Sequence, residues 1–300
     1  MEGFFSKEPL NMQLPQQTVE STLSTLIGKP EIYYMTLPGN GGDSLINIGF
    51  FCLADKLGLQ FKVVGPNATL PPNSTLILAG GGGLVPEHKT AKDMIERYHA
   101  TVASMIILPC TARNCDSLLS SLGSNTVIFF REHYSYAYGS RTCTGGAKAY
   151  FDHDMAFHMD IDIVFSEKLP FLPPRRSLYN FIRLILVARL RGISFFTRTL
   201  QAYRTDIEAA SPKNGSIAND VSKICSFGTI DRRACFYSAR AFLGTLSKFE
   251  EIRTDRLHVA IGAAILKKKV SLRDNSYYKC RAVYESSLRG RFDVTMANSG

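Results

Sequence analysis

The sequence contains no tryptophan, no CxxC motif and no apolar run that reaches the ~18 residues of a membrane-spanning helix. Its seven cysteines are odd in number and irregular in spacing, which argues against a disulfide framework and a structural zinc site. The N-terminus carries acidic residues, Glu2 and Glu8, where a signal peptide needs basic ones. We therefore expect a reducing compartment: the cytoplasm, or the inner face of the plasma membrane.

Metal-ligand spacing is also missing. Four histidines stand apart from any such pattern and are expected to be packed or exposed: His88, His99, His133 and His158. His153 lies between Asp152 and Asp154, but a structural role is expected there too. The sequence thus predicts neither a metal ion nor a cofactor.

Basic residues exceed acidic ones, 35 to 26, and give a formal net charge of +9. Such a charge favours acidic partners, which include nucleic acid, anionic lipid and phosphorylated metabolites. The basic residues are dispersed and form no lysine-rich tail. Nucleic acid is therefore the least favoured of these partners, and none is expected.

The first half alternates short apolar runs with helical segments. Strands are predicted at residues 31–35, 61–64, 74–79, 104–109 and 126–131, and a helix at 44–57. Glycine-rich loops follow the first and third strands, at 39–42 and 80–83. This order is typical of a parallel α/β sheet, in which ligands bind beyond the carboxyl ends of the strands.

A proline-rich linker and a basic, apolar helix open the second half. Residues 175–191 place Arg183, Arg189 and Arg191 among leucines, isoleucines and phenylalanines. Such a helix can lie in a membrane interface. The alternative is a helix buried between two lobes, with its arginines lining the cleft. Further strand ends are predicted at 202–206 and 251–255.

The sequence Arg256-Leu257-His258 stands where a charged turn leads into an apolar helix. A helix start offers free N–H groups and a positive dipole end to an anion. Arginine adds a fixed cationic fork, and histidine exchanges protons near neutral pH. The pattern indicates chemistry on a phosphorylated or carboxylated substrate, although a plain helix start with a surface arginine fits it equally.

Six ordered elements together resemble the polysaccharide pyruvyl transferase family over roughly residues 30 to 285. They are Gly39-Asn40-Gly41-Gly42-Asp43, the run Gly80–Leu84, Arg131-Glu132 with Ser135, Asp154-Met155-Ala156-Phe157, Arg204-Thr205-Asp206-x-Glu208 with Asn219-Asp220, and Arg256-Leu257-His258 with Tyr277-Tyr278-Lys279. The resemblance implies an α/β fold of two Rossmann-like lobes facing a cleft, as in GT-B glycosyltransferases. It also implies transfer of pyruvate from phosphoenolpyruvate to two hydroxyls of a sugar, with release of phosphate.

These residues suit that chemistry. Phosphoenolpyruvate carries a phosphate and a carboxylate, so its site needs cations, for which Arg256 and Arg204 are the first candidates, followed by Arg131 and Lys279. His258 is the candidate general acid or base. Two carboxylates could orient sugar hydroxyls or stabilise positive charge: Asp43 and Asp206.

The loop residues are expected to contact the donor or the acceptor: Asn40, Gly41, Gly42, Gly81, Gly82, Gly83 and Ser135. Structural roles are open for several of these residues. Asp43 suits a helix N-cap, Asn40 a tight turn, and the glycine run a close approach of two backbones.

The expected domain organisation has an N-terminal lobe over residues 1–165, with the C-terminal segment 281–300 packed back on it. A basic, apolar segment over 166–200 separates this lobe from a C-terminal lobe over 201–280. The acceptor would be a lipid-linked oligosaccharide or a polysaccharide, with an anionic membrane surface as a further partner. The alternatives are a GT-B glycosyltransferase that uses a nucleotide sugar and a non-enzymatic anion-binding assembly protein.

Overall fold

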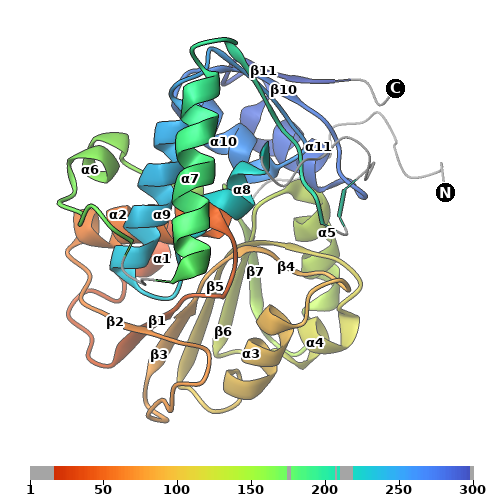
Figure 1. The fold of residues 1–300 in the computed structure, drawn as a ribbon. Helices are drawn as coiled ribbons and strands as arrows, with labels where there is room; N and C mark the ends of the chain where they lie inside the picture. Colours follow the sequence, from red (N-terminus) through yellow and green to blue (C-terminus); the bar gives the residue numbers. More distant parts are fainter. Residues whose placement is uncertain (1–16, 174–176, 207, 210–218, 298–300) are drawn as a thin grey trace.

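The computed structural model describes residues 17–173, 177–206, 208–209 and 219–297. The described chain forms two parallel β-sheets with helices packed on their faces (Figure 1). The predicted α/β class with parallel sheets is therefore confirmed.

The first sheet has seven strands within the described ranges. They run in the order β2 (Lys62–Val64), β1 (Ile32–Met35), β3 (Thr75–Leu78), β5 (Ser104–Ala112), β6 (Thr126–Phe130) and β7 (Lys148–Phe151), and β4 (Gly81–Leu84) pairs with β5. The helices of this half are α1 (Val19–Ser24), α2 (Gly41–Leu57), α3 (Thr90–Tyr98), α4 (Asp116–Ser121) and α5 (His133–Thr142). All five predicted strands are present to within a few residues.

The second sheet has four strands in the part of the chain that is described. They are β11 (Val294–Met296), β10 (Lys269–Leu272), β9 (Glu251–Thr254) and β8 (Thr199–Ala202), all parallel. Its helices are α7 (Leu178–Ile193), α8 (Val221–Ile224), α9 (Arg232–Leu246), α10 (Leu257–Ile265) and α11 (Lys279–Val283), which leads into the π-helical turn η4 (Tyr284–Leu288). The strand end predicted at 202–206 ends at Ala202, and the residues that follow lie beyond the strand.

The glycine run 80–83 does not form the predicted loop. Gly81 begins strand β4, which pairs with β5. Gly81 has φ +113°, and a Cβ there would lie 2.9 Å from Ile46 Cδ1. Only glycine suits this position, because the backbone is left-handed and approaches helix α2 closely.

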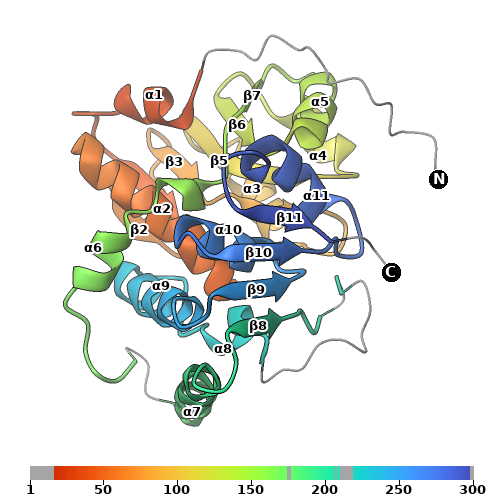
Figure 2. The same cartoon turned by 90° about the horizontal axis from the view of Figure 1, so that it is seen from above.

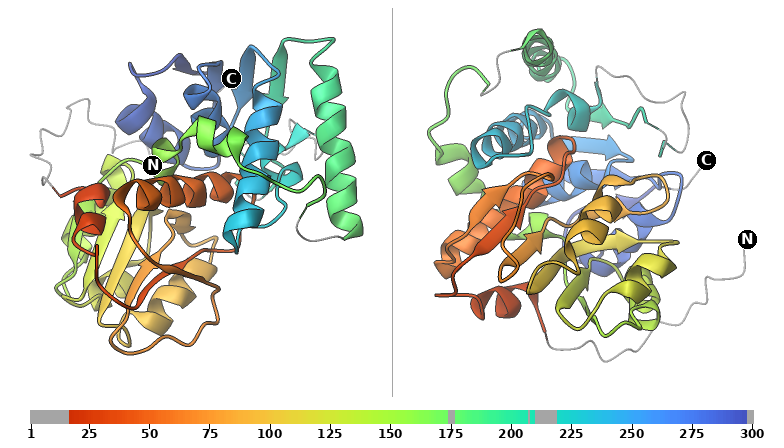
Figure 3. Two further views of the ribbon diagram at one scale, coloured as in Figure 1. Left: turned by 90° about the vertical axis from the view of Figure 1, so that its left-hand side faces the viewer. Right: turned by 90° about the horizontal axis from the view of Figure 1, so that it is seen from below.

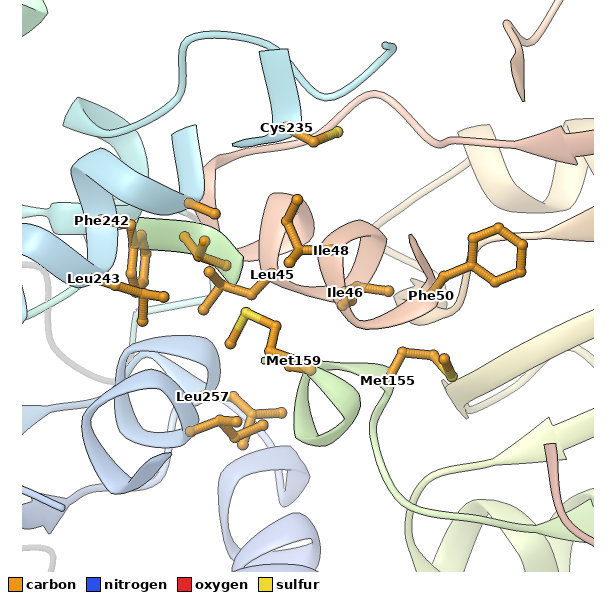
Figure 4. Close-up of a cluster of buried hydrophobic side chains, with 14 of the residues drawn as sticks. Leu45, Ile46, Ile48, Phe50, Met155, Met159, Cys235, Phe242, Leu243 and Leu257 are labelled. Atoms are coloured by element: carbon orange, nitrogen blue, oxygen red, sulfur yellow. The ribbon is translucent and has the colours of Figure 1, made fainter. Parts of the chain in front are cut away.

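Helix α2 connects the two halves of the molecule. On β5, Ile106 and Leu108 face a core that also contains apolar residues of α2 and of the second sheet, whereas Met105 and Ile107 face a separate core with α3 and α4. Figure 4 shows Leu45 and Ile48 of α2 among Phe242, Leu243 and Leu257 from the second half. The two sheets are thus joined by one continuous apolar core rather than by linkers alone.

The segment that links the halves contributes Met155, Ala156, Met159 and Val164 to this core. The 3-10 turn η1 (Met155–His158) packs against α2, and α6 (Ile161–Ser166) packs against α9. The C-terminal part of the predicted segment 281–300 adds strand β11 to the second sheet. Residues before β11 contact the first half, since Ser287 Oγ lies 2.9 Å from His153 Nδ1. The proposed domain boundaries at 165, 200 and 280 stay a prediction.

Helix α7 lies on the outside of the second half, where Figure 2 shows it almost end-on at the edge of the molecule. It packs against α8 and α9, and none of its residues lines the cavity between the sheets. The expectation that its arginines line the cleft is therefore wrong, whereas the expected packing of its apolar side chains in the core is met by Val187 and Leu190. Within the described ranges, no helix is long and apolar enough to cross a membrane.

Because α2 packs closely against η1, adding a methyl group at Gly49 should destabilise the fold much more than adding one at Gly192. A Cβ on Gly49 would overlap the Met155 backbone carbonyl, whereas a Cβ on Gly192 of α7 meets nothing within 4 Å. We expect Gly49→Ala to lower the free energy of unfolding by about 1–3 kcal/mol or more, because the two backbones must separate. Gly192→Ala should be neutral or add up to about 1 kcal/mol of helix propensity. Urea unfolding measures both, and equal effects would contradict the close packing.

Candidate functional site

A cavity of about 230 Å³ opens where the carboxyl ends of strands from both sheets meet. Its residues follow five strands: Leu37, Pro38, Gly39 and Asn40 after β1, Ala79 and Gly80 after β3, Arg131 after β6, Arg204 and Asp206 after β8, and Arg256 after β9. Ten of the fourteen predicted site residues line this cavity: Asn40, Asp43, Gly82, Gly83, Arg131, Arg204, Asp206, Arg256, His258 and Lys279.

The first cluster in the cavity is built around the buried carboxylate of Asp154. Arg131 donates from Nη1 to Asp154 Oδ2 at 2.7 Å and from Nε to Thr111 Oγ1 at 2.9 Å. His258 Nε2 lies 3.4 Å from the same Asp154 oxygen. Burial alone would raise the pKa of Asp154, but His258 and Arg131 lower it below its ordinary range. Asp154 therefore stays ionised and orients both the arginine and the imidazole.

The second cluster joins the two arginines of the second half. Arg204 donates to Asp206 at 2.7 Å, and Arg256 Nη2 reaches Asp206 at 2.9 Å and Asp220 at 2.5 Å. Burial favours the neutral acid, yet the hydrogen bond from Arg204 and the charge of Arg256 lower the pKa of Asp206. Arg256 Nε is buried and has no hydrogen-bond partner in the described chain.

The third cluster is centred on Glu208, which is almost fully buried. Lys279 Nζ donates to Glu208 at 2.7 Å, His88 Nε2 lies 3.3 Å away, and Arg204 forms a further ion pair with it. Burial raises and these partners lower the pKa of Glu208, with a net shift below its ordinary value. Burial lowers the pKa of Lys279, and Glu208 opposes that shift. Lys279 is thus a buried, paired side chain and not a solvated one.

The N-terminus of α2 forms another wall of the cavity. Asn40 is the N-cap, and its side chain accepts from Gly42 N at 2.8 Å, while Asp43 accepts from Asn40 N at 2.7 Å. This capping box starts the helix three residues earlier than the sequence pattern predicted. Asp43 is therefore the third helical residue and not the cap. It still faces the cavity, so its structural role and a role toward a ligand are compatible.

Three of the predicted glycines lie beside the cavity without lining it: Gly41, Gly42 and Gly81. A Cβ on Gly42 would lie 2.7 Å from His258 Nδ1, and one on Gly41 would lie 3.0 Å from the Cys225 carbonyl oxygen. These two glycines let α2 approach the second half closely enough to place His258. Gly82 lies between two cations, since its Cβ would be 3.4 Å from Arg131 Nη2 and 3.6 Å from Lys279 Nζ.

Ser135 is not placed to contact a ligand. It is fully buried, its Oγ accepts from Ala112 N at 2.8 Å, and its N–H donates to the carboxylate of Glu132. Glu132 is the N-cap of α5. The Arg131-Glu132-x-x-Ser135 element therefore fastens α5 to β5 and leaves Arg131 at the strand end, facing the cavity. The expectation of a ligand contact from Ser135 is not met by this geometry.

Four side chains at the site were not among the predicted residues: His88, Asp154, Glu208 and Asp220. Asp154, Glu208 and Asp220 stood in motifs that carried the family resemblance, which was a usable signal. His88 was expected to be packed or exposed, yet it lines the cavity. Nothing near His88 in the sequence marks it, because Glu208 lies 120 residues away along the chain.

The charges of the site are closely balanced. Four cations, Arg131, Arg204, Arg256 and Lys279, each pair with at least one of four carboxylates, Asp154, Asp206, Glu208 and Asp220. The carboxylates hold the cationic groups in fixed positions, which suits recognition of a polyanion with two acidic ends. No group of three His, Cys, Asp or Glu side chains among the described residues could hold a metal ion.

Parallel sheets with helices on their faces, and a cavity at the carboxyl ends of the strands, define an α/β protein of the Rossmann type. A crystal structure of an uncharacterised protein from Klebsiella pneumoniae subsp. pneumoniae shares this fold, with a TM-score of 0.74 and 24% identity over 93% of this chain and 97% of that chain. The family model for polysaccharide pyruvyl transferase matches residues 31–277. The chain belongs to that family. No curated protein matches it.

Titration of His88 should control how strongly the cavity binds anions. The hydrogen bond to Glu208 raises the pKa of His88, so its positive charge persists above the ordinary value and disappears as the pH rises through the raised one. The contact between protonated His88 and Glu208 stabilises the fold fully below the unfolded pKa of about 6.5. This stabilisation is lost as the pH rises from that value through the raised pKa. We expect inorganic sulfate, whose charge is constant near neutral pH, to bind more weakly above this pKa, as measured by calorimetry. His88→Gln should remove that pH dependence and His99→Gln should keep it; a flat wild-type profile would contradict the assignment.

Proposed function

We propose that this protein transfers pyruvate from phosphoenolpyruvate to two hydroxyls of a sugar, forming a cyclic ketal and free phosphate. Membership of the polysaccharide pyruvyl transferase family supports pyruvate transfer to a polysaccharide. The acceptor is a polysaccharide or its lipid-linked oligosaccharide precursor, as in a bacterial-type cell-surface glycan. The reaction takes place in the cytoplasm, at the inner face of the plasma membrane when the acceptor is lipid-linked.

The observation that carries this proposal is the convergence of two histidines, His88 and His258, and four paired cations on one small cavity. Phosphoenolpyruvate has a phosphate and a carboxylate on adjacent atoms of a three-carbon unit. Arg204 and Arg256 both contact Asp206, and Arg131 and Lys279 both approach Gly82. Two cationic positions in one cavity suit the two acidic ends of this donor.

The reaction adds one proton to the methylene carbon and removes one from each of two hydroxyls. One hydroxyl oxygen bonds to the central carbon as the methylene carbon is protonated. The carbon–phosphate oxygen bond then breaks, an oxocarbenium-like carbon forms, and the second hydroxyl oxygen bonds to it. The departing phosphate takes up the remaining proton, so the sum is one ketal and one phosphate.

His258 is the group that we assign to proton transfer, as acid or base. Its imidazole is oriented by Asp154 from one side and confined by Gly42 from the other. Asp206 and Asp43 line the same cavity and are the carboxylates that would orient hydroxyls or stabilise the positive carbon. No metal or cofactor takes part in this proposal.

Two measurements test the proposed donor and reaction. Phosphoenolpyruvate should raise the midpoint of thermal unfolding, whereas nucleotide sugars should not, because a ligand stabilises only the state that binds it. Phosphate should be released from phosphoenolpyruvate in the presence of a panel of lipid-linked oligosaccharides. Protection by nucleotide sugars alone would favour a glycosyltransferase, and no phosphate release with any acceptor would favour a non-enzymatic role.

His258→Ala should abolish transfer while phosphoenolpyruvate still binds. Proton transfer typically contributes ~10²–10⁴-fold to rate, and the donor is held mainly by the arginines and Lys279. Turnover is measured by phosphate release and binding by thermal shift. His99→Ala, outside the cavity lining, is the matched control and should retain full turnover. A His258→Ala protein with more than half of wild-type turnover would remove His258 from the mechanism.

Arg256→Lys should raise the KM for phosphoenolpyruvate although the charge is kept. Lysine is a point charge and cannot span Asp206 and Asp220 while also presenting a second donor to the ligand. Turnover should fall too if Arg256 also stabilises the phosphate as it leaves. Arg198→Lys is the control, because Arg198 forms an exposed ion pair with Glu250 far from the site. An unchanged KM in Arg256→Lys would count against a donor-binding role.

A further inference from the structure

Helix α7 presents an apolar face to solvent. Its outward side chains recur at helical spacing and are largely exposed: Leu178 79%, Phe181 45%, Ile182 46% and Ile185 68%. Two phenylalanines directly after the helix, Phe195 and Phe196, are 88% and 92% exposed, and Phe171 before it is 94% exposed. Isolated exposed apolar residues are normal, but seven of them on and beside one helix favour an interaction surface. We call these seven residues the α7 face.

The opposite side of α7 is already used for packing. Val187 and Leu190 are buried in the shared core, and Arg191 donates to the Ala241 carbonyl oxygen on α9 at 3.2 Å. The helix is therefore held in place by its inner side, and the exposed face does not result from a loosely attached helix. The left view of Figure 3 shows α7 along the outer edge of the second half, away from the first sheet.

The sequence around α7 is rich in basic residues, although one of them, Arg198, forms an exposed ion pair with Glu250. Residues 168–203 contain seven basic side chains and no acidic one. They are Lys168, Arg183, Arg189, Arg191 and Arg198, together with Arg175 and Arg176, which lie outside the described residues; Arg191 packs on α9. Arg189 is exposed beside the apolar stripe, and Arg183 lies over the Tyr179 ring at 4.3 Å from its centroid. Apolar side chains flanked by arginines are complementary to a bilayer that carries negative headgroups.

We propose that the α7 face binds the surface of an anionic lipid bilayer, with the helix axis parallel to the membrane plane. The phenylalanines at both ends of the helix enter the boundary between headgroups and acyl chains, and the arginines contact the headgroups. This inference deepens the proposed location at the inner face of the membrane, but it rests on exposed residues and not on the reaction.

Among the described residues, only one helix, α8, separates α7 from the cavity lining. Helix α8 packs against α7, and Ser222 of α8 lines the cavity. An acceptor whose lipid portion stays in the bilayer would thus have its sugar presented one helix away from the membrane-bound surface. Binding of α7 to the bilayer would raise the local concentration of such an acceptor near the site.

Vesicle flotation tests the proposal on the full-length protein. Wild-type protein should float with phosphatidylcholine vesicles that contain phosphatidylglycerol at low salt, and not with phosphatidylcholine alone. Binding should fall at about 1 M salt, where charges are screened beyond about 3 Å. The double variant Phe195→Ser with Phe196→Ser should bind more weakly by about tenfold for each side chain removed from the interface.

Matched variants separate the electrostatic contribution to vesicle binding from the apolar one. Arg189→Glu should weaken binding to anionic vesicles by about tenfold, since each basic residue near such a surface contributes to attraction. Arg141→Glu changes the net charge equally but lies on α5 of the first half, and it should bind as wild type does. Ile27→Ser is the apolar control, because Ile27 is half exposed on another face. Arg191 is left unchanged because it holds α7 to α9.

Three results would decide what the α7 face binds and whether the proposed reaction holds. If the wild-type protein never floats with anionic vesicles at low salt, the proposal is wrong. A wild-type dimer that the phenylalanine double variant converts to a monomer, as measured by sedimentation, would assign the face to a second copy of this chain. Phosphate release with a water-soluble acceptor should be unchanged in the double variant. Flotation without phosphate release would leave the membrane inference standing and overturn the proposed reaction.

Discussion

Close contact between helix α2 and the second half of the molecule is the constraint on which the site depends. Two glycines of α2 permit it, since Gly41 faces backbone of the α8 region and Gly42 faces His258, while Gly49 lets α2 approach the backbone of the linking turn η1. Without a Cβ at these positions, the helix start carries the capping box to the cavity wall and His258 reaches Asp154. The shared apolar core then holds both sheets at the distance that closes the cavity.

Charge compensation explains how so many ionised groups can occupy this small space. A buried cation without a partner costs several kcal/mol, whereas each cation here is held by an ionised carboxylate. The carboxylates therefore position the arginines and do not simply cancel them. His88 also contacts Glu208, and the hydrogen bond between them raises the pKa of the imidazole.

The sequence patterns predicted most strands and helices correctly. The errors lie where tertiary packing outweighs the preference of the local sequence. The predicted strands and the helix that begins after Arg256 are present, because alternation and glycine-terminated runs reflect backbone geometry directly. The run 80–83 reads as a loop from its composition, yet β5 offers it a pairing edge and makes it a strand. Ser135 reads as a ligand contact from its motif, but Glu132 and Ala112 bind it in the interior.

The sequence by itself determined the class of fold, the family, and the charged residues at the ends of the strands, because these depend on local periodicity and ordered motifs. Tertiary structure alone decided which charges are partners. His88 and Glu208 are 120 residues apart, and Arg131, Asp154 and His258 come from three separate segments. It also decided that the apolar side chains of α7 face outward, since periodicity shows that a helix has an apolar side but not what covers it.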